Sequence, residues 1–252
     1  MTNAKRLRIH RARQLAPRHA VGIENRLVSL LLRHHDVYAA ALKARAIEVA
    51  KAHQRVDVKG KPSTPKSLAR TVHREAERTA EEVRVRVAKA LGVKPKDFDI
   101  DLTRHVTALS DTVAAIQQEY AARSTERVAE TMNEWLNLGE LSPRAGDLDA
   151  LNDMMSDGLE AVASKMEQAT RGAFGDAWAD MNQDAQRQAG VEQYVWVCEV
   201  DKATRPAHLA LNGETCDWDD PPLKAAVSSN EEDDHPGEDY SCRCIASPLA
   251  PG

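Results

Sequence analysis

The residues best suited to chemistry are thiols and imidazoles near the end of the chain. All four cysteines fall in the last 55 of the 252 residues. In a reducing compartment, such clustering favours free thiols or metal ligands over disulfides. Zinc takes four nitrogen or sulfur ligands in a tetrahedron. The candidate ligands for a structural zinc ion are His208, Cys242 and Cys244, with either Cys216 or His235 as the fourth.

Cys242 and Cys244 are two residues apart, and on an extended strand that spacing directs both sulfurs to one side. The spacing is not that of a regular Cys-x2-Cys pair, and the same residues also have an interpretation without metal. Cys198 and Cys244 then fill the core as small apolar residues, and His208 is a hydrogen-bonded core histidine. The sequence leaves both interpretations open.

Catalysis is a third use of these side chains. A Cys–His dyad would pair His208 with Cys216 or Cys242, and a metal nuclease would use His208 with Asn212. The sequence contains no Gly-rich phosphate loop, no Gly-x-Ser-x-Gly elbow and no His-Glu-x-x-His motif. We therefore expect a protein that is not an enzyme.

A short strand must position part of this set. After Gly190 the pattern changes from helical to alternating, and the run 194–200 predicts a strand with Tyr194, Trp196, Cys198 and Val200 on one side. Short elements and turn residues follow, which indicates a small α+β domain. Its arginines, Arg205 and Arg243, are interpreted as internal partners of Asp201 or of the acidic run 231–234.

The rest of the chain reads as helix. Aromatic residues make up only 4% of the sequence, which suits helices packed through Ala, Leu, Val and Met. Apolar spacing predicts four helices. They run from 21 to about 53, from Ser67 as the cap to about 91, from about 102 to 138 and from 148 to about 189. The fold class is therefore mainly α, with long helices in a bundle or coiled-coil-like arrangement followed by a small C-terminal α+β domain. The predicted parts are a basic N-terminal helical arm (1–55), a linker (56–67), a helical body (68–189) and the C-terminal domain (190–252).

Charge divides the chain into two halves. Residues 1–98 hold 23 Lys or Arg against 9 Asp or Glu, and residues 99–252 hold 11 against 30. The basic half suits DNA or an acidic protein surface, whereas phosphate would repel the acidic half. The residues that we expect to make this contact are Arg6, Arg8, Arg11 and Arg13. No stretch is apolar enough to span a bilayer and no secretory signal is recognisable, so we expect a soluble protein made in the cytoplasm, with no membrane partner.

The C-terminal features also follow a known order. A Trp-bearing strand, an Asp, an Arg-x-x-His step, an Asn-Gly turn and a Pro-led Cys-Arg-Cys occur at Trp196, Asp201, Arg205, His208, Asn212–Gly213, Pro236 and Cys242–Arg243–Cys244. This series, over about sixty residues, resembles the phage Mu F-like head-morphogenesis family. The resemblance implies a minor head protein present in a few copies inside the procapsid of a tailed bacteriophage. Its implied partners are the portal protein, the major capsid or scaffold protein and, in some members, packaged double-stranded DNA.

Two other functions remain open on the sequence alone. Mu F-like domains also resemble modules that carry toxins, so an exported toxin or nuclease effector is the alternative. A DNA-binding scaffold unrelated to phage is the third. The expectation that we carry forward is a virion protein inside the head near the portal vertex, found in the host cytoplasm during assembly.

Overall fold

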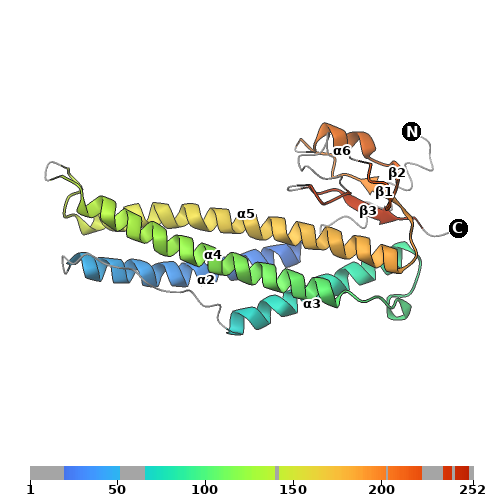
Figure 1. Cartoon of the computed structure of the whole chain (residues 1–252), viewed down its shortest axis with the longest axis horizontal. Helices are drawn as coiled ribbons and strands as arrows, with labels where there is room; N and C mark the ends of the chain where they lie inside the picture. The colour runs from blue at the N-terminus through green and yellow to red at the C-terminus, as the bar shows by residue number, and fades with distance from the viewer. Residues whose placement is uncertain are drawn as a thin grey trace. The chain divides into compact units, whose positions relative to one another are not determined.

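The computed structural model describes residues 20–51, 66–139, 142–202, 204–222, 235–239 and 242–249. The helices are α2 (Ala20–Lys51), α3 (Lys66–Ala90), the 3-10 turn η2 (Pro95–Asp97), α4 (Thr103–Leu136), α5 (Leu148–Gln188) and α6 (Pro206–Leu211); the strands are β1 (Gln193–Val197), β2 (Thr215–Asp217) and β3 (Ile245–Pro248) (Figure 1). The prediction of long helices followed by a small α+β region is confirmed. The arginines of the N-terminal arm, residues 56–65 of the predicted linker and the acidic run 231–234 lie outside the described residues.

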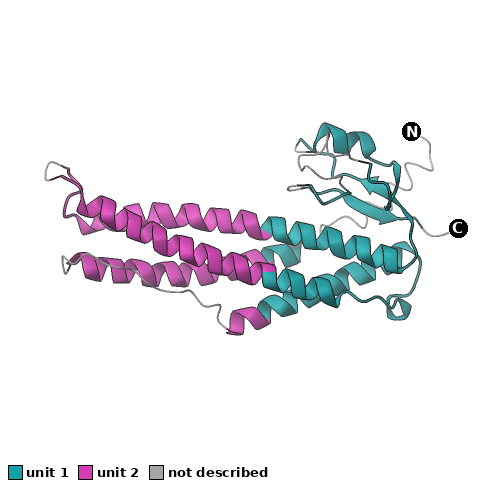
Figure 2. Cartoon of the chain, in the orientation of Figure 1, with its two compact units in different colours: residues 1–25, 71–111, 171–252 teal, residues 26–70, 112–170 magenta. Residues whose placement is uncertain are grey.

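The chain divides into two compact units, each made of separated stretches (Figure 2). Unit 1 comprises Met1–Asn25, Thr71–Asp111 and Arg171–Gly252, and unit 2 comprises Arg26–Arg70 and Thr112–Thr170. The division into four consecutive parts stays a prediction, although α3 begins at Lys66, inside the last two residues of the predicted linker. Among the described residues, no helix combines the length and the apolar character that crossing a bilayer demands.

Unit 2 has a helical core drawn from α2, α4 and α5. Its buried members are Ala39, Ala46, Ala50, Val128, Met132, Trp135, Leu151, Met155 and Leu159. Most of the α4 and α5 residues in this set belong to the apolar stripes that predicted these helices. Three alanines on α2 let the neighbouring side chains approach its backbone closely, and Met and Trp fill the space that remains.

A buried histidine lies in unit 2. His35 is 6% exposed, and its Nε2 is 2.9 Å from the hydroxyl of Ser124. Ser124 donates its own hydrogen to the carbonyl of Tyr120, so His35 Nε2 must carry the hydrogen of the first bond. His35 Nδ1 is then unprotonated, and within the described part of the chain it has no hydrogen-bond partner. Burial lowers the pKa of His35, and the nearby carboxylate of Asp36 opposes that shift only in part.

This histidine makes stability depend on pH. Because its pKa is lower in the folded state, the unfolded chain takes up the proton first, and stability falls as pH drops below about 6.5. One proton limits the slope to about 1.4 kcal/mol per pH unit. His35→Gln keeps a donor for Ser124 and cannot titrate, so urea unfolding between pH 7.5 and 5.5 should show a flatter dependence than in the wild type. Parallel curves for the two proteins would contradict the assignment.

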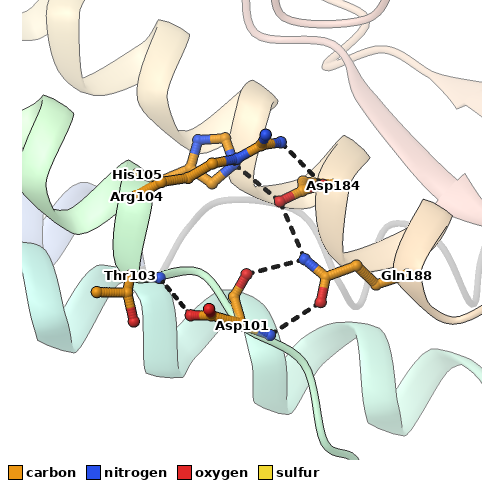
Figure 3. Close-up of polar contacts among 6 residues, drawn as sticks. All are labelled: Asp101, Thr103, Arg104, His105, Asp184 and Gln188. Carbon is orange, nitrogen blue, oxygen red and sulfur yellow. Dashed lines mark hydrogen bonds and ion pairs between the residues drawn. The ribbon is translucent and has the colours of Figure 1, made fainter.

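In unit 1 a polar cluster joins the start of α4 to the end of α5 (Figure 3). Asp101 caps α4 by accepting a hydrogen bond of 2.9 Å from the backbone N–H of Thr103. Gln188 pairs with the backbone of Asp101 through both amide atoms, at 2.9 and 2.8 Å. The two carboxylate oxygens of Asp184 lie 3.0 Å from a guanidinium nitrogen of Arg104 and 3.0 Å from Nε2 of His105. These contacts secure the last turns of α5, immediately before the chain enters β1.

Candidate metal centre

The small sheet has the strand order β2–β1–β3, and both pairings are antiparallel. One face carries Tyr194, Trp196, Cys198, Cys216, Trp218, Cys244 and Ala246, all buried. The other carries Val195, Val197 and Ile245. The alternation predicted for the strand is therefore confirmed from Tyr194 to Cys198, although β1 ends at Val197. The prediction is wrong for Val200, which lies beyond the strand and is 49% exposed.

Helix α5 holds this sheet through side-chain amides. Asn182 and Gln186 both donate to the carbonyl oxygen of Ala246, at 3.0 and 2.9 Å. Gly190, with φ +74°, ends the helix and turns the chain towards β1. At the far end of β1, the N–H of Gly213 donates to the carbonyl of Trp196 at 2.7 Å, and Gly213 has φ +85°. The predicted Asn-Gly turn is thus present and sets the return from α6 into β2.

Three of the predicted ligands come together. The sulfur of Cys242 is 3.3 Å from Nδ1 of His208, and the sulfur of Cys244 is 3.5 Å from the same nitrogen. The three ligand atoms all lie within 4.8 Å of one another. Cys242 and Cys244 precede β3 and are not on a strand. The alternation of side chains along a strand, which predicted both sulfurs on one side, therefore does not explain their position. The backbone N–H of Cys244 instead donates to the sulfur of Cys242 at 3.4 Å, which turns both sulfurs towards α6.

The opposite nitrogen of His208 faces an acid. Nε2 is 3.4 Å from Oδ2 of Asp239, whose side chain is 0% exposed, and Nε of Arg205 is 3.4 Å from the same oxygen. A hydrogen on Nε2 leaves the lone pair of Nδ1 directed at the two sulfurs. The ring of His208 also meets the ring of Trp196 edge to face, with centroids 5.5 Å apart. The orientation of His208 is therefore set from several sides.

Cys198 lies next to this group, and the sequence did not predict it as a ligand. Its sulfur is 3.3 Å from that of Cys244 and 3.0 Å from the backbone oxygen of His208. The sequence analysis treated Cys198 only as a core residue. The signal available was the alternation of the strand, which placed Cys198 on the same side as Trp196.

The two residues predicted as fourth ligands lie elsewhere. The Nδ1 of His235 is 2.8 Å from the hydroxyl of Tyr194. Burial raises the pKa of Cys216, and the Tyr194 side chain, its hydrogen-bond partner, opposes that shift in part. Neither residue belongs to the group formed by His208 and the two thiols, so this part of the prediction is corrected. The physical reason is the register of β1 with β2, which places Cys216 opposite Tyr194.

The thiols differ in their readiness to ionise. The hydrogen bonds that Cys242 shares with Cys244 and, to a smaller extent, with His208 lower the pKa of Cys242 to about 4 against the effect of burial. Its hydrogen bonds to Cys198 and Cys242 raise the pKa of Cys244. The hydrogen bond with Cys242 raises the pKa of His208. A thiolate next to an imidazole can ligate a metal or act as a nucleophile, and Asp239 would orient the histidine in either case.

The remaining motif residues make a charged pair at the surface. Arg243 is 2.6 Å from Asp201 and 3.1 Å from Glu199, so the predicted contact with Asp201 is present. Beside it lies a cavity of about 130 Å³. Its lining includes Phe174, Trp178, Cys242 and Cys244, so the two thiols border open space.

The comparison with known families decides the relationship. The model of the family described as phage Mu protein F like protein matches residues 111–247, more than half of the chain. This chain belongs to the phage Mu F-like family. The match begins within α4, so it includes most of α4 and all of α5 as well as the sixty residues from which the resemblance was drawn.

The comparison with individual proteins adds little. An uncharacterized protein of Haemophilus influenzae is 28% identical over 71 residues, which are 28% of this chain and 14% of that protein. The alignment thus spans only a small part of the length of that relative. No solved structure matches the chain. Within this Mu F-like chain, Trp196, His208, Cys242 and Cys244 meet on one face of the sheet, whereas Asp201 and Arg243 pair at its edge.

Proposed function

We propose that this protein is a minor head protein of a tailed bacteriophage, bound to the portal inside the procapsid and acting in head assembly. The observation that carries the proposal is the family match over residues 111–247, which includes the whole motif series. The proposed location is the inside of the head near the portal vertex, with assembly in the host cytoplasm. The proposed role is structural, and we expect no catalytic activity.

The charge segregation supports a division of roles. The first 98 residues are strongly basic and the remainder is acidic. A basic surface is attracted to packaged DNA or to an acidic face of the portal, capsid or scaffold protein, and an acidic one is repelled by DNA. We therefore assign partner binding to the basic half. The C-terminal region is assigned the role of a folded domain that anchors the protein.

Co-purification with the portal protein of the same genome tests the assembly role. The full chain, tagged and co-expressed with that portal protein, should form a complex that survives moderate salt. A folded chain that never retains the portal protein would refute the proposed partner. The toxin alternative has its own readout, growth arrest on expression that disappears with His208→Ala, and we expect no arrest.

DNA contact is tested through its salt dependence. The variant Arg6→Gln, Arg8→Gln, Arg11→Gln, Arg13→Gln should weaken binding to double-stranded DNA. If each arginine meets one phosphate, the slope of log K against log salt should fall by roughly 0.9 per residue, or about 3.6 for four. Fluorescence anisotropy over a range of salt concentrations measures both quantities.

The matched control neutralises the same number of charges in the acidic half. Arg123, Arg127, Arg144 and Lys165 changed to Gln should leave the slope unchanged, because repulsion keeps that half from DNA. An equal loss in both variants would mean that only net charge matters. An unchanged slope in the N-terminal variant would remove DNA from the proposed partners.

Zinc is the ion that we propose for His208, Cys242 and Cys244, with a structural purpose. It accepts imidazole and thiolate together, whereas calcium and magnesium prefer oxygen. Three protein ligands leave one position of a tetrahedron to be supplied.

A further inference from the structure

We infer that Cys198 supplies the fourth ligand, which gives a closed Cys3His zinc centre whose histidine is oriented by Asp239. The inference rests on the proposed zinc ion and is independent of the role in head assembly. It replaces Cys216 and His235, which the structure places around Tyr194.

The distances fit a tetrahedral centre. With sulfur about 2.3 Å and nitrogen about 2.0 Å from zinc, tetrahedral angles place neighbouring ligand atoms about 3.5 to 3.8 Å apart. Three pairs here lie at 3.3, 3.5 and 3.3 Å, namely Cys242 with His208, Cys244 with His208, and Cys198 with Cys244. The two nitrogen–sulfur pairs lie within about 0.2 Å of the ideal edge, and the sulfur–sulfur pair is about 0.5 Å shorter than the ideal edge. Two sulfurs that approach one imidazole nitrogen this closely present the donor set that zinc accepts.

Cys198 requires one local change. The atoms of the other three residues lie mutually within 4.8 Å, and Cys198 stands next to that group, against the carbonyl oxygen of His208 at 3.0 Å. It joins the centre by giving up this weak contact for a metal bond. Its backbone is already fixed, because its N–H donates to the side chain of Asn212 at 3.1 Å.

Asp239 acts on the metal through His208. A zinc-bound histidine usually donates its other N–H to a carboxylate or carbonyl, which fixes the tautomer and makes the ligand more basic. Oδ2 of Asp239 lies 3.4 Å from Nε2 of His208 and from Nε of Arg205, which are ion-pair distances and not a formed hydrogen bond. The arrangement therefore requires a small closing movement of Asp239 and His208 when the metal binds. Asp239 is therefore a positioning residue rather than a ligand.

The centre also answers a weakness of the small sheet. Its strands have 5, 3 and 4 residues, which is short for an independent sheet. One zinc ion would join the end of β1, helix α6 and the segment before β3, and would add to the buried cluster that these parts share. Small domains commonly gain their stability from such a metal. The cavity that borders Cys242 and Cys244 supplies a path of entry.

The test is metal stoichiometry together with the number of thiolates. The full chain, purified under reducing conditions, should contain one zinc per molecule by elemental analysis. Replacement by cobalt(II) should give a tetrahedral spectrum with sulfur-to-cobalt charge-transfer intensity for three thiolates in the wild type. Cys198→Ser should reduce that intensity to two thiolates, and Cys216→Ser, the matched buried thiol outside the group, should leave it at three.

Three other results would each overturn part of the zinc proposal. A cobalt spectrum of the wild type that shows two thiolates would exclude Cys198 as a ligand. This measurement uses the wild-type chain, so it does not depend on whether a variant folds. A metal-free chain that binds no cobalt and whose Cys242 is alkylated rapidly at neutral pH would replace the centre by a reactive thiol. A Cys198–Cys244 disulfide in the chain as isolated would equally overturn the metal assignment.

Asp239→Asn tests the positioning role. It should weaken zinc binding by about 10- to 100-fold in competition with a chelator, while the cobalt spectrum still shows three thiolates. Unchanged zinc affinity in a folded Asp239→Asn chain would show that the acid serves packing alone.

Discussion

Alanine at Gly237 is expected to destabilise the C-terminal region by about 3 kcal/mol. Gly237 has φ +101°, and a Cβ there would lie 2.7 Å from the Cβ of Ala179 on α5. Two costs combine, the left-handed backbone and a contact that real Cβ atoms do not make. Relief requires the segment 235–239 to move away from α5, and that segment carries Asp239. Urea unfolding of the wild type and the variant measures the loss.

Two controls separate the costs. Gly92 has φ +74° and no atom within 4 Å of its Cβ position, so Gly92→Ala measures the backbone cost alone, about 1 kcal/mol. Ala179→Gly removes the opposing methyl at a helix-propensity cost of about 1 kcal/mol. The double variant Gly237→Ala, Ala179→Gly should lose less unfolding free energy than the two single variants lose together, by more than about 1 kcal/mol. Additive effects would mean that the two residues do not touch.

The helices and the first strand were predictable because their signal is local. Burial of one side of a helix repeats every three or four residues, and that of a strand every two. The stripe Val106, Leu109, Val113, Ile116 and Tyr120 is buried as its spacing predicted. Trp196 and Val197 likewise face opposite sides of the sheet. Glycine also marked the ends, at Gly92 after α3 and at Gly190 after α5.

The composition of the site was only partly predictable because it depends on which segments meet. Cys242 and Cys244 are near in sequence, and the motif linked them to His208. Cys198 reaches them only because β1 pairs with β3, a register that no local pattern specifies. Asp239 gave no signal, since an acid in an acidic segment is unremarkable until its burial is known. The same limit explains why Cys216 and His235 were predicted as fourth ligands although they lie outside the group, because the number of candidates says nothing about their placement.

Replacing Trp196 by alanine should cost about 3 to 5 kcal/mol and unfold the sheet before the helices. Trp196 is 0% exposed, lies at the centre of the cluster on the α6 side of β1 and meets the ring of His208 edge to face. Its loss removes one of the two tryptophans of that cluster and leaves a cavity which strands this short cannot close. Hydrogen exchange read by mass spectrometry should show lost protection of Gln193–Val197, with residues 112–136 of α4 as the internal reference.

The contrast with two other variants makes this result specific. Trp196→Phe keeps an aromatic edge against His208 and should retain most of the protection, whereas Leu209→Ala, at a side chain that is 46% exposed on α6, should change stability by less than about 0.5 kcal/mol. If zinc holds the region, the Trp196→Ala chain should regain part of its protection when zinc is added in excess, because a ligand that binds only the folded state stabilises it by mass action. Wild-type protection of β1 in Trp196→Ala without added metal would show that the apolar cluster contributes little, and that the sheet depends on its hydrogen bonds to α5 instead.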